Sequence, residues 1–591
     1  MKKITIAFCL SFIFFNVMSQ PFTHADTLRG SIGPGRSWWD VTKYNLYVKF
    51  NFSDSTINGY NIISYKEIQK NHIDYFQIDL QEPMIIDSVI MDQGIKSRER
   101  EISGNKRVTY FDTKRKLGFT REGNAWIVSL KNTQPVSNEQ APPNSLRMGQ
   151  PVIAPPTADQ IKSQSNLPTL TIYYHGKPKI AINPPWGGGL IWKRDKAGNP
   201  WVSIACQGLG ASVWYPCKDI QSDEPDSAEI HVTAPSDLVT VSNGRQRGLL
   251  TNNDGTTTTS WAVVNPINNY NLIPYIGKYV HFDETYKGEK GDLTMDYWVL
   301  DSNLAKAKKQ FQDAPRMMKV FEYWFGPYPF YEDGYKLVDA PHLGMEHQSA
   351  VAYGNGYQNG YHGMDLSGSG WGMKWDFIIV HESGHEWFAN NITAKDIADN
   401  WIHEGITSYS ETLFTEYYYG KDAATAYVTG LRKNIENKVP IIPAYGVNRD
   451  GPIDIYYKAS NMLHTIRQVI NDDSLFRKIL RGLNKTFYHQ TVTTKQVEDY
   501  ISKESQIDFS KVFDQYLRTI KIPVLEYSIK DGQMRYRWAN CIPGFNMPVK
   551  ILNEKGKYMF IYPKDTMQQL KTGLKEIKVD VNFYIDTHQI N

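Results

Sequence analysis

The chain has 591 residues, more than a single hydrophobic core usually supports, so three or four domains are expected. It carries 65 Lys plus Arg against 62 Asp plus Glu, and this balance excludes the strongly basic surface that nucleic-acid binding requires. Nucleic acid is therefore not an expected partner.

The N-terminus has the pattern of an export signal. Two lysines precede an apolar run from Ile4 to about Val17, and small or polar residues follow around Ser19. The run is shorter than the ~20 residues of a membrane-spanning helix, which favours a cleaved signal over a membrane anchor. We predict a signal peptide at 1–19 and a periplasmic or secreted protein without stable membrane insertion.

The cysteines do not form the pattern of a disulfide framework. Cys9 lies in the predicted signal, and Cys206, Cys217 and Cys541 are few and scattered. A single bridge between Cys206 and Cys217 stays open, because its geometry does not follow from sequence.

Short alternating segments dominate the chain from about Val41 to Tyr279. They include YNLYVKF, YFQIDL and AEIHVTA, and turn-rich pieces separate them. A Pro-, Ser- and Gln-rich stretch at 134–168 has little periodicity and is expected to be a surface excursion. This part of the chain therefore predicts a β domain.

The pattern becomes helical from about Ser302, in segments such as KWDFIIVHESGHEWFANNI, EGITSYSETLFTEYYY and YYKASNMLHTIRQVI. Alternation returns after about Lys521 in VLEYSIK, QMRYRWAN and KYMFIY. We therefore predict a multidomain α+β protein. Its expected parts are an N-terminal β domain at 20–285, a mainly helical catalytic domain at 286–520 and a small C-terminal β domain at 521–591.

His381 and His385 lie four residues apart in VHESGHEWF. In an α-helix this spacing puts both imidazoles on one face and turns Glu382 toward the water that a metal would bind. A catalytic zinc takes three protein ligands and keeps a further position open. Glu404 follows His385 after eighteen residues, at the head of the next helical pattern, where an antiparallel return brings it back. The spacing predicts one zinc ion held by His381, His385 and Glu404.

A surface helix with two unrelated histidines is the alternative interpretation. The neighbouring residues are large and apolar, which indicates a helix buried on most sides, where polar side chains need partners. These residues are Phe377, Ile378, Ile379, Val380, Trp387 and Phe388.

The metal segments resemble one family, the gluzincin zinc aminopeptidases that include aminopeptidase N and leukotriene hydrolase. HESGHEWFANNIT resembles that family's HExxHxWFGN, and WIHEGITSY resembles its WLNEGFASY, with Glu404 at the family's spacing. The segment APHLGMEHQSAV resembles the stretch that carries GxMEN, which places Gly344, Met345 and Glu346 in the exopeptidase motif.

Two further segments extend the resemblance. YYKASNML is similar to the family's YEKGAxxL, which places Tyr456 on the catalytic tyrosine. ACQGLGASVWYPCKD is similar to the strip whose Gln or Glu binds the substrate amine, here Gln207.

The chain also departs from the family pattern. The Asn of GxMEN is His347 here and its first Gly is Leu343. We expect His347 to line the site rather than act as a fourth ligand, since a fourth protein ligand would close the position that catalysis needs. Tyr457 and Ala459 replace the Glu and Gly of YEKG, so the choice of Tyr456 rests on its offset to Lys458.

The resemblance implies a β-sandwich-like N-terminal domain, a thermolysin-like zinc domain and a β-sandwich-like C-terminal domain. It implies removal of N-terminal amino acids from peptides by attack of a zinc-bound water, with Glu382 as general base and Tyr456 as oxyanion donor. Glu346 and Gln207 are then expected to hold the free amino group of the peptide, beside Gly344 and Met345.

Three alternatives stay open: an endopeptidase or an epoxide hydrolase on the same zinc scaffold, and a non-catalytic peptide-binding relative. Glu346 and Gln207 speak against an endopeptidase. The presence of all three ligands and of Glu382 speaks against a non-catalytic relative.

Overall fold

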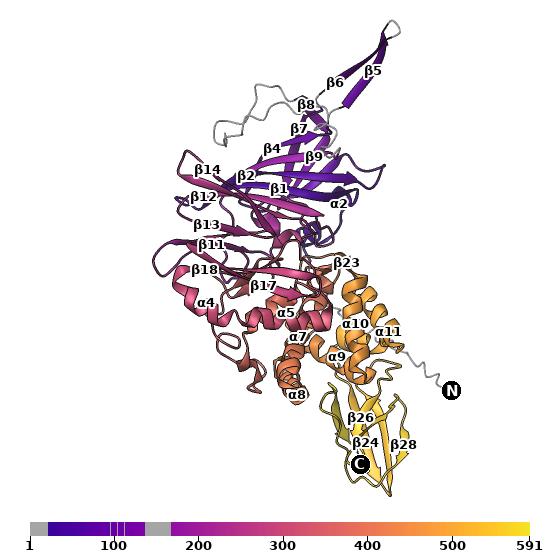
Figure 1. Cartoon of the computed structure of the whole chain (residues 1–591). Helices are drawn as coiled ribbons and strands as arrows, with labels where there is room; N and C mark the ends of the chain where they lie inside the picture. The colour runs from indigo at the N-terminus through magenta and orange to yellow at the C-terminus, as the bar shows by residue number, and fades with distance from the viewer. Residues whose placement is uncertain (1–21, 95, 103–104, 112, 136–166, 591) are drawn as a thin grey trace, which may run out of the picture.

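The computed structural model describes residues 22–94, 96–102, 105–111, 113–135 and 167–590. The predicted signal at 1–19 and most of the excursion at 134–168 lie outside these residues. Within them, no helix combines the length and the apolar character needed to cross a membrane. From one end to the other, a β-rich part, a helical part and a small β module follow one another (Figure 1).

The N-terminal part is built on a ten-stranded sheet. Its strands in spatial order are β14 (Arg245–Thr251), β15 (Thr256–Val263), β12 (Ser227–Pro235), β1 (Trp39–Asn51), β2 (Thr56–Glu67), β9 (Thr169–Gly176), β4 (Ile85–Asp92), β7 (Arg115–Glu122), β8 (Ala125–Pro135) and β3 (Tyr75–Asp79). Burial alternates along β1 and β2, as the sequence pattern predicts for strands with one face in a core. In the register of the central strands, Leu46 lies opposite Asn61 of β2 and Ile230 of β12.

A second, four-stranded sheet packs against the first. It consists of β10 (Gly189–Arg194), β11 (Pro200–Ala205), β16 (Pro274–Gly277) and β13 (Val239–Ser242). One hydrophobic cluster takes side chains from both sheets, for example Leu46 from the first and Ile204 from the second. This is the sandwich-like arrangement that the resemblance implied. The hairpin of β5 (Lys96–Ile102) and β6 (Asn105–Phe111) projects from this part (Figure 1).

A five-stranded sheet connects the β-rich part to the helices. Its order is β17 (Tyr279–Gly288), β18 (Gly291–Leu300), β19 (Tyr335–Asp339), β21 (Val351–Tyr353) and β20 (Gly344–Met345). The boundary predicted after residue 285 falls inside β17, and β17 forms a hairpin with β18. The division into domains stays a prediction.

The helical part carries the segments with the predicted metal ligands. Its helices are α4 (Leu304–Gln310), α5 (Asp313–Phe325), α6 (Phe377–Gly384), α7 (Trp401–Tyr419), α8 (Lys421–Gly430), α9 (Asp454–Ile470), α10 (Asp473–Thr486), α11 (Thr494–Ser505) and α12 (Ser510–Arg518). The short strands β22 (Ile392–Ala394) and β23 (Gln490–Val492) pair in parallel. Near the N-terminus lie α1 (His24–Gly30) and α2 (Pro34–Ser37).

One helix is shorter than its sequence pattern predicts. The helical pattern continues to Ile392, but α6 ends at Gly384, with His385 as its cap. The amides of Glu386 and Trp387 bond to carbonyls three residues back, and Ala389 has φ +153°, so the helix cannot continue. His385 keeps αR torsions and its place on the helix face.

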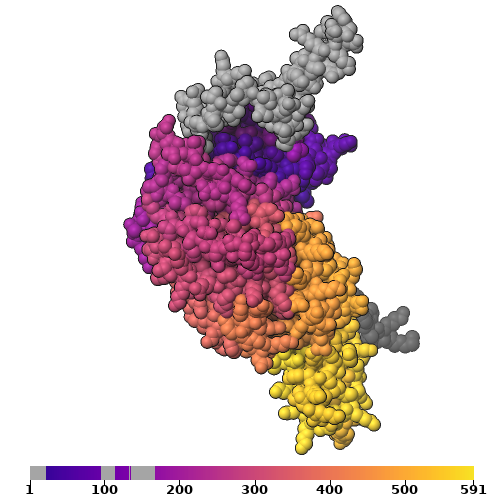
Figure 2. All heavy atoms as spheres, viewed as in Figure 1, coloured from indigo at the N-terminus to yellow at the C-terminus, as the bar shows by residue number. Residues whose placement is uncertain are grey.

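The C-terminal module contains β24 (Val524–Lys530), β25 (Gln533–Ala539), β28 (Gln568–Lys571) and β29 (Asp586–Gln589) in one sheet, with β26 (Val549–Leu552) and β27 (Tyr558–Ile561) in a second. It forms a protruding lobe beside the C-terminal helices (Figure 2). Its apolar side chains belong to the same core cluster as the helical part. His464 of α9 bonds to Asn582 at 2.8 Å, and the Tyr516 hydroxyl of α12 donates to the Tyr584 carbonyl.

Candidate metal site and substrate cavity

Three predicted ligands meet where α6 packs against α7. Nε2 of His381 lies 3.6 Å from Oε2 of Glu404, and Nε2 of His385 lies 3.4 Å from the same oxygen. Ligand atoms about 2.1 Å from a tetrahedral zinc are about 3.4 Å apart. His381, His385 and Glu404 are exposed by only 6%, 2% and 5%. The spacing and the donor set fit a zinc ion.

The carboxylate of Glu404 adds an independent test of this fit. Its Oε2 is buried and has no hydrogen-bond partner among the residues that the structure describes. A buried carboxylate oxygen is costly unless a donor or a cation compensates its charge. Both imidazole Nε2 atoms face this oxygen. A cation bound between the three atoms would therefore compensate the charge of the carboxylate.

The other ring nitrogens have partners that fix the tautomers. Nδ1 of His381 donates to Oε1 of Glu411 at 2.7 Å, and the Tyr427 hydroxyl donates to the other oxygen of Glu411 at 2.6 Å. Nδ1 of His385 donates to the Phe388 carbonyl at 3.1 Å. Both Nε2 lone pairs are therefore free for a metal.

Glu411 was not predicted from the sequence. It lies seven residues after Glu404 on α7, two helical turns along the same face, and this spacing is a signal that was available.

Glu382 faces the ligand set from α6. Its carboxylate, that of Glu346 and the His385 imidazole offer atoms within 4.8 Å of one another. Burial raises the pKa of Glu382 to about 7, against the opposing effect of His381 and His385. A carboxyl group with this pKa can both accept and release a proton near neutral pH.

Gly344 fits closely against Glu382. A Cβ at position 344 would lie 2.7 Å from Oε1 of Glu382 and 2.9 Å from Cγ2 of Ile378. Only glycine therefore leaves the Glu382 carboxylate where it is. Met345, the second residue of β20, is buried and pairs with Ala352 of β21.

Glu346 follows β20 and enters the same space. The Tyr270 hydroxyl donates to its Oε1 at 3.0 Å, and the Asn390 side chain donates to its backbone carbonyl at 2.9 Å. Burial raises the pKa of Glu346, and His385 opposes this shift. Sequence analysis missed Tyr270 and Asn390, and neither lies in a pattern that would have indicated them.

A cavity of about 470 Å³ joins these groups to Gln207, which follows β11. The predicted residues that line it are His381, His385, Glu404, Glu382, Glu346, Gly344, Met345, Gln207 and Tyr456. The structure therefore brings every predicted site residue to one cavity, from the β-rich part, α6, α7 and α9.

Tyr456 and Tyr457 both line the cavity, but they differ in what surrounds them. The Tyr456 ring lies 6.1 Å from the His381 ring. Burial raises its pKa well above the usual range, and the charges of Glu404, Glu346 and Glu382 add to this. For Tyr457, burial raises the pKa to about 12, with Glu411 as the next cause. Tyr456 is thus the tyrosine beside the ligand set. The offset to Lys458 in the sequence also favoured Tyr456 over Tyr457.

His347 does not line the cavity, so that expectation is wrong. It is fully buried, and its Nδ1 lies 2.7 Å from the Tyr275 hydroxyl. Glu346 points toward the cavity, so the next residue of the extended chain points away from it. Cys206 and Cys217, whose pairing was open, are buried free thiols.

Comparisons with known proteins point to one family. Residues 311–516 match the model of the peptidase family M1 domain. The chain is 20% identical over 342 residues to leukotriene A-4 hydrolase of Xenopus laevis, covering 54% of this chain and 53% of that protein. It is 25% identical over 233 residues to aminopeptidase N of Lactobacillus helveticus, covering 35% and 26%. The matches thus span about half or less of these relatives.

Solved structures show the same fold. The M1 zinc metallopeptidase of Deinococcus radiodurans superposes with a TM-score of 0.62 at 17% identity, covering 83% of this chain and 96% of that one. A point mutant of that metallopeptidase bound to a Tyr-Ser-Ala substrate superposes with the same TM-score. The matched segment and the fold thus agree: residues 311–516 match the peptidase family M1 domain, and the chain has the fold of the M1 zinc metallopeptidases.

Proposed function

We propose that this chain is a zinc-dependent aminopeptidase that removes N-terminal residues from peptides. The observation that carries the proposal is the position of Glu346, a buried carboxylate beside Glu382 and His385 in the cavity of the metal ligands. A carboxylate at that place gives the substrate's ammonium group a partner next to the scissile bond.

His381, His385 and Glu404 would hold the zinc. When bound, zinc supplies a Lewis acid that polarises the scissile carbonyl and makes a water molecule more acidic. Glu382 takes the proton from the attacking water and passes it to the leaving amine, which its pKa of about 7 permits. The Tyr456 hydroxyl, which burial keeps protonated, donates a hydrogen bond to the oxyanion that develops on the carbonyl.

Glu346 and Gln207 approach the substrate amine from two walls of the cavity. Glu346 contributes charge, and the Gln207 amide contributes a neutral acceptor. Hydrogen bonds to charged groups contribute about 1.5–3 kcal/mol each. Two such contacts favour a free N-terminus over an internal peptide bond by orders of magnitude.

Hydrolysis of a free peptide and of its N-acetylated form by the purified protein tests the proposal. We expect cleavage of the free peptide one residue at a time, with about one zinc per chain by metal analysis. Equal rates on the two peptides would instead indicate an endopeptidase. A zinc-free, inert wild-type protein would indicate a non-catalytic relative.

We also propose that the protein acts outside the cytoplasm, periplasmic or secreted. The support is the Lys-Lys pair followed by a short apolar run before Ser19. Sequencing the N-terminus of the exported protein tests this proposal, with a start near residue 20 as the expected result. An intact Met1 on cell-associated protein would contradict it.

A further inference from the structure

Residues 23–37 lie against two neighbouring segments that contribute to the substrate cavity, and we call them the N-terminal clamp. The clamp contains α1, whose N-terminus is fixed by a capping box between Thr23 and Asp26, and α2. It contacts residues 206–219, the amine strip, which begins with Cys206 and Gln207. It also contacts residues 447–450, which lead into α9 and Tyr456.

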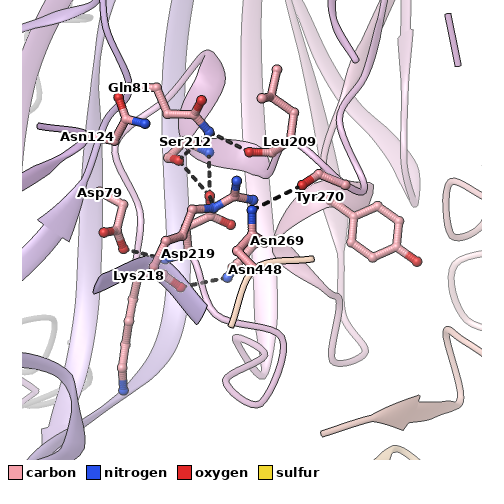
Figure 3. Close-up of polar contacts among 12 residues, drawn as sticks. Asp79, Gln81, Asn124, Leu209, Ser212, Lys218, Asp219, Asn269, Tyr270 and Asn448 are labelled. Carbon is pink, nitrogen blue, oxygen red and sulfur yellow. Dashed lines mark hydrogen bonds and ion pairs between the residues drawn. The ribbon is translucent and has the colours of Figure 1, made fainter. Parts of the chain in front are cut away.

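Two buried carboxylates meet at the end of the amine strip, Asp219 of the strip itself and Asp79 of β3. The backbone amide of Asp219 donates to Oδ2 of Asp79 at 2.9 Å, so the two acids are neighbours. The Asp219 carboxylate also accepts from the amide and the hydroxyl of Ser212, at 3.2 and 2.6 Å. Figure 3 shows Asp79, Ser212 and Asp219 pointing toward one another, with Gln81 bonded to Ser212 and to the Leu209 carbonyl.

The clamp supplies a cation to each of these acids. Arg36 contacts Asp79 at 2.5 Å and is fully buried. Arg29 lies 3.3 Å from Oδ2 of Asp219, with 13% of its side chain exposed. Arg36 also donates to the Arg29 carbonyl at 2.7 Å, which joins the two arginines. Two adjacent buried carboxylates need such partners, because removing one member of a buried pair leaves an uncompensated charge.

The amine strip is shaped to receive Arg29. Gly210 has φ +91°, and a Cβ there would fall 1.8 Å from a guanidinium nitrogen of Arg29. The guanidinium therefore occupies the space that any other residue at 210 would fill. Gly210 and Gln207 are three residues apart, and Arg29, Gly210 and Gln207 line one small cavity behind the substrate cavity.

The clamp also contacts the stretch 447–450, which lies beside the amine strip. The Asn448 amide donates to the Asp26 carbonyl at 3.1 Å, and the Asn448 side chain donates to the Gly208 carbonyl at 3.5 Å. Gly30 packs against this stretch so closely that a Cβ would lie 2.3 Å from the Val447 carbonyl carbon. One segment thus holds both the strip with Gln207 and the stretch that leads to Tyr456.

We propose that Arg29 of the N-terminal clamp is a positioning residue that holds Gln207 at the substrate's amino group. This inference rests on the proposed aminopeptidase function. Arg29 does not line the substrate cavity, so it acts through the strip. When the Arg29 guanidinium is removed, the Asp219 carboxylate keeps its bonds to Ser212 but loses its cation, and the space beside Gly210 is empty. Gln207 is then no longer held in place.

Two inhibitors that differ only in the amino group test this role. Leucine hydroxamate carries the amine, and 4-methylpentanohydroxamate lacks it, while both chelate zinc in the same way. The inhibition constant of the amine-free compound divided by that of leucine hydroxamate therefore measures the amine contact separately from the rate of turnover. We call this quotient the ratio. We expect Arg29→Ala to weaken leucine hydroxamate about tenfold and the amine-free compound less than about twofold, which corresponds to loss of one hydrogen-bonded contact.

Three comparison variants keep the test decisive. Arg29→Lys retains the charge and should recover part of the ratio. Gly30→Ala keeps both arginines, but its Cβ pushes the clamp away from Val447, so it should also lower the ratio. This variant replaces Arg29→Ala in the test if Arg29→Ala does not fold. Arg537→Ala removes an arginine that pairs with Glu526 in the C-terminal module, and should leave the ratio unchanged.

Each outcome bears on one of the two claims. A wild-type protein that binds both hydroxamates equally would overturn the proposed aminopeptidase. If the wild type prefers the amine and Arg29→Ala keeps that preference, or weakens both compounds alike, the positioning role is wrong.

Discussion

The helix pair with the predicted metal ligands and the amine-binding wall that we propose share one cavity, but they are assembled differently. His381, Glu382, His385, Glu404 and Glu411 all lie on α6, its C-cap and α7, so helical spacing sets much of their geometry. The amine-binding wall takes Glu346 and Gln207 from segments far apart in the chain, and Tyr270 and Arg29 support it from two further segments. We infer that the helix pair carries the chemistry and the wall carries the selectivity, which separate substitutions can test.

The largest effect is expected at the metal itself. Glu404→Ala removes the carboxylate that both imidazoles face, so zinc binding and hydrolysis should fall to background in metal analysis and peptide assays. In the wild type, zinc at about 1,000 times its dissociation constant should add about 4 kcal/mol of stability. A matched Glu332→Ala variant, at an exposed position, should keep both properties. Full activity in Glu404→Ala would refute the ligand set.

The next effect separates chemistry from metal binding. Glu382→Gln keeps the size of the side chain but cannot accept the water's proton, so turnover should fall about 10²–10⁴-fold. Zinc content should stay that of the wild type, since Glu382 is not a ligand. An unchanged kcat in Glu382→Gln would contradict the role of Glu382 as general base. Glu332→Gln serves as the control in the same assay.

Selectivity should depend on the amine-binding wall. Glu346→Gln replaces a charge-assisted contact by a neutral one, so kcat/KM on free peptides should drop about 10–100-fold. The slow rate on N-acetylated peptides should stay constant, and zinc content should not change. If both substrates lose rate equally, Glu346 belongs to the chemistry and the division between the two regions fails.

The smallest effect is expected at the residues that hold the His381 imidazole in place. Glu411→Gln removes the charge behind His381, and zinc affinity should fall about 10–100-fold, as measured by competition with a chelator. Tyr427→Phe removes only the second bond to Glu411 and should cost less. A Glu411→Gln protein with wild-type zinc affinity would show that the tautomer of His381 is set in another way.

The same difference explains what sequence could predict. The ligand set and Glu382 were predicted from helical spacing, because a helix converts sequence distance into position. Tyr456 was predicted from the family resemblance and its offset to Lys458. Tyr270 and Arg29 reach the site only through tertiary packing, which no local pattern encodes. His347 was misplaced because the side-chain alternation after β20 turns it away from Glu346. The pattern through Ile392 overstated α6, because Ala389 takes a backbone conformation that ends a helix.

The hydrogen bonds between the C-terminal module and the helices affect how the molecule unfolds. His464 and Thr465 of α9 hold Asn582 and Tyr584, and Tyr456 lies on the first turn of the same helix. The module and α9 share one apolar core, so neither can open without exposing the other. Heat or denaturant should therefore unfold the lobe and the helix that carries Tyr456 in a single cooperative step.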